Sequence, residues 1–111
     1  MLRGILYETL QSDAGGATVR LLPESPVYKG HFHGYPITPG VCLVQMALEL
    51  IGEKEGRPVS LAAARNIKFT SPVMPDAVTQ LRFNLLGEGG AWSVEVFAGE
   101  VSCAKMSLTL A

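Results

Sequence analysis

Hydrophobic and polar residues alternate along much of the chain. Apolar positions recur at every second residue in three stretches, 81–85, 92–96 and 104–110. A period of two is typical of β-strands with one buried face. Two earlier strand-like runs, 5–10 and 17–22, are separated by turn-forming Ser, Asp and Gly residues. The pattern predicts an opening hairpin and a later antiparallel meander, because turn signals separate the strands at short intervals.

A helical spacing runs from about residue 40 to residue 54. Thr38 is a candidate N-cap, and Pro39 suits the first helical position. Apolar residues, Val41 among them, cover most of the helix circumference, so we expect the helix to be buried. The polar positions form a single stripe along one side, made of Cys42, Gln45 and Glu49. That stripe must face water or other polar groups.

The composition is that of a globular domain with a full core. The chain has 111 residues, of which 48% are hydrophobic and 17% are charged. This length suits one domain, so we expect residues 1–111 to form a single unit. Nine Lys and Arg residues face ten Asp and Glu residues, for a net charge of −1. The chain therefore lacks the basic surface by which proteins grip nucleic acids or anionic membranes.

The cysteines and the first residues of the chain bear on its compartment. Only Cys42 and Cys103 are present, and the first residues show no signal-peptide pattern. We therefore expect reduced thiols and a cytoplasmic location. Prolines and glycines interrupt the uncharged stretch 30–48, and its apolar run after Pro39 is shorter than the ~20 residues of a membrane span. We expect no such span.

Two segments carry the chemical information. Residues 29–41 read KGHFHGYPITPGV and lead into the helix, and residues 66–76 read NIKFTSPVMPD. In this order, the two segments resemble the β-hydroxyacyl-(acyl carrier protein) dehydratases. The resemblance implies an α+β hot-dog fold, in which a curved antiparallel sheet wraps around one central helix. It also implies at least a homodimer, because the family's site lies between two protomers.

The resemblance implies loss of water from a 3-hydroxyacyl thioester in fatty-acid or polyene-type acyl assembly. His31 would be the base that takes the C2 proton, since imidazole titrates near neutral pH. The Gly40 N–H would stabilise the thioester oxygen at the helix start. The family's helix carboxylate falls on Gln45, which has no titrating proton, so we expect Gln45 to orient the departing water. Glu49, one turn further on, is a hypothetical displaced acid, and an ordinary solvent-facing carboxylate is the alternative.

Other residues are assigned by the same resemblance. Arg65 and Lys68 are candidates for contact with an acidic acyl carrier protein, with an ordinary solvated surface as the alternative. Coenzyme A is an alternative carrier of the substrate. The candidate substrate-binding residues are Phe32, His33, Val41, Phe69 and Pro72.

We expect no cofactor. His31 and His33 form a His-Xaa-His pair, but no third ligand with suitable spacing accompanies them, so we expect no metal. The dipole at the helix start could activate the Cys42 thiol, and packing is the alternative role for this residue.

Two other functions remain open at this stage. The loss of the carboxylate at Gln45 also fits a non-catalytic acyl-binding subunit that pairs with an active dehydratase. A hot-dog thioesterase is the third possibility, although the histidine-bearing segment before the helix favours dehydration.

Overall fold

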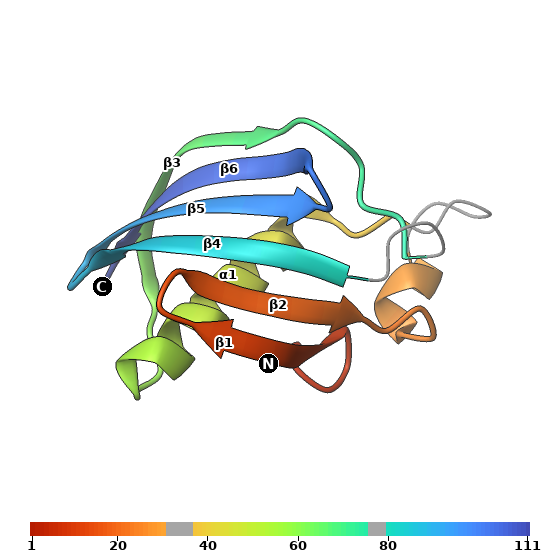
Figure 1. The fold of residues 1–111 in the computed structure, drawn as a ribbon, viewed down its shortest axis with the longest axis horizontal. Coiled ribbons are helices and arrows are strands. Elements are labelled where there is room, and N and C mark those ends of the chain that lie inside the picture. Colours follow the sequence, from red (N-terminus) through yellow and green to blue (C-terminus); the bar gives the residue numbers. More distant parts are fainter. Residues whose placement is uncertain (31–36, 76–79) are drawn as a thin grey trace.

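The computed structural model describes residues 1–30, 37–75 and 80–111, and these residues form a curved sheet and one long helix (Figure 1). The helix is α1 (Gly40–Glu55), and a short 3-10 helix, η1 (Pro26–Gly30), precedes it. The strands are β1 (Tyr7–Asp13), β2 (Gly16–Leu21), β3 (Leu61–Phe69), β4 (Gln80–Glu88), β5 (Ala91–Ala98) and β6 (Val101–Leu110).

The six strands pair in the order β1-β2-β4-β5-β6-β3, and every neighbouring pair is antiparallel. The predicted opening hairpin and the predicted meander of β4, β5 and β6 are confirmed. β3 precedes β4 in the chain but pairs with β6, so β1 and β3 form the two edges of the sheet. α1 lies across the concave face between these edges (Figure 1). This arrangement is the one that the resemblance implies.

The hydrophobic core lies between α1 and the sheet. Inward positions of the strands alternate with outward ones, as the period of two predicts, and Phe83 and Val96 have no exposed surface. On the helix, Met46 and Ile51 are completely buried. The expectation of burial is wrong at the first turn, because the Val41 side chain is 75% exposed. The buried residues of α1 lie between Leu43 and Gly52, and one face of the helix start is uncovered.

The start of α1 differs from the predicted capping. Pro39, and not Thr38, is the N-cap residue, and among the described residues no side chain caps the first turn. The Thr38 hydroxyl instead pairs with the buried Tyr28 hydroxyl at 2.8 Å. Gly56 ends the helix in the left-handed conformation that suits a C-terminal cap. In the described parts of the chain, no helix has both the length and the apolar character to cross a membrane.

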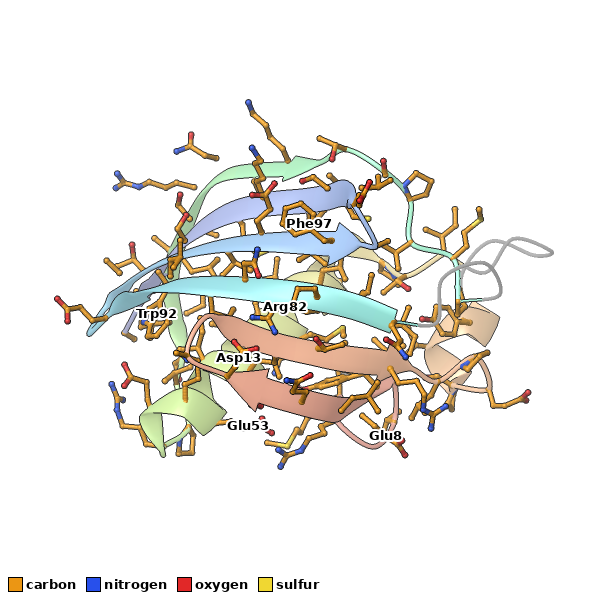
Figure 2. The ribbon with its side chains drawn as sticks, in the orientation of Figure 1. Glu8, Asp13, Glu53, Arg82, Trp92 and Phe97 are labelled. Atoms are coloured by element: carbon orange, nitrogen blue, oxygen red, sulfur yellow. The ribbon has the colours of Figure 1, made fainter. Side chains whose placement is uncertain are left out.

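The opening hairpin begins later than its hydrophobic pattern predicts, and its turn lies within the predicted one. Gly4 has a φ of 85°, and the Leu6 N–H donates to the Leu2 carbonyl, so the first residues form a turn and β1 starts at Tyr7. At the other end, Asp13 accepts two hydrogen bonds from Arg82 of β4, at 2.7 and 2.8 Å (Figure 2). This paired contact ties the hairpin turn to the centre of the sheet.

Alanine at Gly16 tests the close approach of β2 to β4. Gly16 has a φ of 152°, and a Cβ atom there would collide with the Phe83 carbonyl oxygen. We expect Gly16→Ala to lower the free energy of unfolding by about 3 kcal/mol. Gly99 has a φ of 61° in open space, so Gly99→Ala should cost only about 1 kcal/mol. Urea unfolding measures both values, and equal losses would contradict the collision.

Candidate active site

The start of α1 forms one wall of a groove of about 370 Å³. The other wall is the segment that follows β3. The lining residues are Ile37, Thr38, Pro39, Gly40, Leu43, Phe69, Thr70, Ser71, Pro72 and Val73. We call this the helix-start groove. It brings together three residues that the sequence analysis predicts for the site, Gly40, Phe69 and Pro72, while the exposed Val41 follows Gly40 on the first turn.

The first turn of α1 has backbone N–H groups without intrahelical partners. Cys42 and Leu43 donate to the Pro39 carbonyl at 3.0 and 3.3 Å, which leaves the Gly40 and Val41 N–H groups ahead of the first helical hydrogen bonds. The first turn holds no acidic residue, and no side chain from the described part of the chain caps it. These N–H groups and the positive end of the helix dipole suit an oxygen that gains negative charge.

The packing of Phe69 leaves no room for a side chain at position 40 unless the half-exposed Phe69 ring moves. A Cβ atom at Gly40 would lie 2.5 Å from the Cζ atom of the Phe69 ring. A backbone hydrogen bond also fixes the residue before the helix to the segment after β3: the Thr38 N–H donates to the Val73 carbonyl at 2.7 Å. The sequence analysis missed this role of Thr38, since a residue just before a helix resembles a cap in any sequence.

A second groove, of about 490 Å³, lies on another side of α1, against the first residues of the chain. We call this the N-terminal groove. Its lining residues are Met1, Arg3, Gln45, Leu48, Glu49, Gly52, Glu53, Gly56, Arg57, Pro58 and Val59. Within one protomer, the predicted residues Gln45 and Glu49 therefore share a groove, while Gly40 belongs to the other one.

Glu49 accepts four hydrogen bonds. Its Oε2 atom accepts from the Leu2 N–H at 2.7 Å and from Gln45 Nε2 at 2.9 Å. Its Oε1 atom accepts from the Arg3 N–H at 3.0 Å and from the Tyr7 hydroxyl at 2.9 Å. Three of these donors are more than 40 residues away in the chain, and no sequence pattern pointed to them. The contact with Gln45 follows from the four-residue spacing.

These contacts favour the ionised form of Glu49. Burial by itself would raise the pKa of this carboxyl, but the hydrogen bonds from Leu2, Gln45, Arg3 and Tyr7 outweigh burial and hold the pKa below its usual value. Burial raises the pKa of Tyr7, and the hydrogen bond and charge of Glu49 raise it further, so the phenol keeps its proton as a donor. An acid must hold a proton near neutral pH, and this environment disfavours that state.

The remaining predicted residues lie in three places. Arg65 and Lys68 are exposed on the edge strand β3, on either side of an irregularity in its pairing with β6. Burial raises the pKa of the Cys42 thiol, which favours the packing role over an activated thiolate. The predicted base His31 and the predicted substrate contacts Phe32 and His33 lie outside the described residues.

Comparisons with known protein structures identify the class of fold that this sheet and helix form. The structure of the dehydratase heterocomplex ApeI:P from Xenorhabdus doucetiae superposes with a TM-score of 0.73 at 16% identity, over 94% of this chain and 96% of that chain. A point mutant of the phenylacetic acid degradation protein PaaI from Thermus thermophilus gives a TM-score of 0.64 at 15% identity, over 98% and 95% of the two chains. These likenesses show the fold, which is the hot-dog fold.

Residues 8–107 match the family described as ApeI-like, ApeI dehydratase, and the chain belongs to this family. Curated relatives include the 3-hydroxyacyl-(acyl-carrier-protein) dehydratase FabZ of Syntrophobacter fumaroxidans, 29% identical over 94 residues, which cover 75% of this chain and 64% of that protein. The FabZ of Geobacter metallireducens is 33% identical over 79 residues, covering 60% and 51%. The chain thus spans between about half and two thirds of the length of these relatives.

The pH dependence of stability tests the state of Glu49. Because the folded pKa of Glu49 lies below the unfolded value of about 4.3, its contribution to stability is complete above that value and is lost as the pH falls through the lower folded pKa. We expect the Tm of the wild type to fall more steeply with acidification below about pH 4.3 than that of Glu49→Gln. Thermal melts monitored by circular dichroism measure this, and parallel curves would contradict it.

Proposed function

We propose that this protein is a 3-hydroxyacyl-thioester dehydratase that acts on substrates carried by acyl carrier protein, in fatty-acid or polyene-type acyl assembly. The observation that carries the proposal is the match of residues 8–107 to the ApeI-like dehydratases. The FabZ relatives support the substrate class, because their names specify 3-hydroxyacyl groups on the carrier protein. The Gly40 and Val41 N–H groups, which have no partner within the helix, support the chemistry.

In this reaction, His31 takes the C2 proton of the substrate. Negative charge then develops on the thioester oxygen, and the Gly40 N–H and the helix dipole stabilise it. The C2–H electron pair forms the C2–C3 double bond as the C3–O bond breaks. The reaction is complete when the His31 imidazolium gives its proton to the departing hydroxide, which leaves as water.

Gln45 orients the hydroxyl group that leaves. An amide offers both a donor and an acceptor but no titrating proton, so it holds the oxygen in place without protonating it. Glu49 as a displaced acid remains the competing assignment for this step. In either case, the 3-hydroxyl must come within hydrogen-bond distance of the N-terminal groove, where both residues lie.

A site formed by two protomers would bring residues of the two grooves together. Gly40 and Gln45 lie in different grooves of one protomer, so we propose that Gln45 of one protomer meets the helix-start groove of its partner. Exposed apolar side chains support a partner on this side: Val41 is 75% exposed, Phe69 is 51% exposed and Ile67 is 38% exposed. Burying such groups is a common reason for small domains to pair.

The phenylalanine, valine and proline side chains at this interface are then the acyl contacts. We assign Val41, Phe69 and Pro72, together with Phe32 and His33, to substrate binding. Phe69 and Pro72 line the helix-start groove directly, and apolar walls of this kind suit an acyl chain.

Loss of water from a panel of 3-hydroxyacyl carrier-protein thioesters tests the function. Mass spectrometry of the acyl group should show loss of one water with the wild type, and His31→Ala should lower the rate at least about 100-fold, since general-base catalysis contributes that much or more. Equal rates for the two proteins would contradict the role of His31. The fold of the variant is checked by its Tm.

A second candidate is the acyl-binding subunit that pairs with an active dehydratase. Two observations favour it: the amide at Gln45 in place of an acid, and the description of the Xenorhabdus doucetiae protein as part of a heterocomplex. In the same assay, no turnover by the wild type together with retained binding of the acyl carrier protein would favour this candidate.

Charge reversal on β3 tests the surface for the carrier. Arg65 and Lys68 are exposed cations on one edge strand, so an acidic carrier protein would meet both of them. We expect Arg65→Glu/Lys68→Glu to raise KM for carrier-bound substrate about 10-fold and to leave KM for a coenzyme A thioester nearly unchanged. Arg20→Glu, on β2 near the opposite edge of the sheet, is the charge-reversal control and should change neither value. An equal effect on both substrates would contradict a carrier surface.

A further inference from the structure

Glu49 lies where the beginning of the chain meets α1, and it contacts Gln45 directly. Each of its two carboxylate oxygens accepts two hydrogen bonds, one set from Leu2 and Gln45 and the other from Arg3 and Tyr7. Two donors are backbone N–H groups and a third belongs to Tyr7, which is completely buried. The carboxylate is therefore held in place by three donors from outside its own helix.

The number of donors specifies the chemical state of this group. An ionised carboxylate only accepts hydrogen bonds, and its two oxygens have room for all four donors. A proton on either oxygen would face a donor that already points at it. The group is thus built as a fixed acceptor, and a proton could be held there only at the loss of a hydrogen bond.

The fixed carboxylate determines how the Gln45 amide is turned. Gln45 has an exposed side chain, which would otherwise sample several rotamers. Its Nε2 atom donates to Glu49 Oε2 at 2.9 Å, whereas the opposite orientation would place its carbonyl oxygen against a negative charge. The observed contact uses one N–H of the amide. Its Oε1 atom and its second N–H remain for another partner.

We propose that Glu49 is a positioning residue: it holds the Gln45 amide so that Oε1 and the second N–H are presented to the 3-hydroxyl group of the substrate, and it transfers no proton. This inference rests on the proposed function. In place of a displaced acid, it assigns a pair of residues: the charged, partly buried Glu49 carboxylate orients the neutral Gln45 amide. The hydrogen bond to an anion also polarises the amide and makes its oxygen a stronger acceptor.

A double-mutant cycle separates positioning from acid catalysis. If Glu49 acts through Gln45, we expect Gln45→Ala and Glu49→Ala each to lower kcat about 10-fold, and the double variant to be no slower than Gln45→Ala alone. The pH profile of kcat/KM should keep its shape in Glu49→Ala. An acid role predicts the reverse: a loss of at least about 100-fold in Glu49→Ala, disappearance of the alkaline limb and little effect of Gln45→Ala. That result would overturn the inference.

Two control variants distinguish the effect of Glu49 on the Gln45 amide from its effect on the placement of the first residues of the chain. Glu53, labelled in Figure 2, pairs with Arg3 from the next turn of α1 but does not contact Gln45 in the described hydrogen bonds. Tyr7→Phe removes one donor from Glu49 Oε1 and leaves the Gln45 contact on Oε2 intact. Tyr7→Phe should retain kcat within about 2-fold of the wild type, because this change does not touch the Gln45 amide. Glu53 lines the N-terminal groove, so Glu53→Gln serves only to measure, by its Tm, how strongly the Arg3 contact anchors the first residues. A loss of about 10-fold in kcat of Tyr7→Phe would assign the effect to the N-terminal segment and overturn the inference.

A measurement on the wild type covers the case in which Glu49→Ala does not fold. In ¹H–¹⁵N spectra, one side-chain amide proton of Gln45 should be shifted downfield, and the shift should collapse when acid protonates Glu49. Free-glutamine shifts, or no change with pH, would overturn the inference. This readout needs no turnover. If the wild type is inactive but shows the shifted amide proton, the proposed dehydratase activity is contradicted. The Glu49–Gln45 contact is then still supported.

Discussion

The arrangement of this protein depends on burial of one helix in a curved sheet. Met46, Ile51 and their neighbours on α1 pack against the inward residues of the strands, and this apolar contact supplies the core of a chain of only 111 residues. Because the sheet curls around α1, its two edges come to lie on opposite sides of the helix (Figure 1). Each edge strand then brings its own flanking segment against α1.

These two flanking segments create the two grooves. The residues before β1 contact the stripe that contains Gln45 and Glu49 and form the N-terminal groove. The residues after β3 contact the helix start and form the helix-start groove. One element thus presents two kinds of chemistry: backbone N–H groups at its first turn, and the polar side chains of Gln45 and Glu49 roughly one to three turns later. Their separation in one protomer is a direct consequence of the helix lying between two sheet edges.

The need of buried polar groups for hydrogen bonds explains the contacts of the polar stripe on α1. A carboxylate that is half-buried against the core needs donors, and the turn at residues 2–6 supplies backbone N–H groups and is followed by the Tyr7 hydroxyl. The same carboxylate then restrains the amide one turn before it. The structural anchor of the first residues and the orientation of a candidate site residue therefore share one group, the Glu49 carboxylate.

The sequence by itself determined the elements, because burial on one face leaves a period of two in strands and apolar residues around a buried helix. The strands β4, β5 and β6, the extent of α1 and the family of the chain followed from local pattern and from the segments around His31 and Asn66. The pairing of β3 with β6, the N-cap at Pro39 and the exposure of Val41 did not, since each depends on which surfaces meet in space. Only the tertiary structure decided the state of Glu49. A glutamate on a helix has the same local signal whether it faces water or four donors, and three of those donors come from residues 42 to 47 positions earlier in the chain.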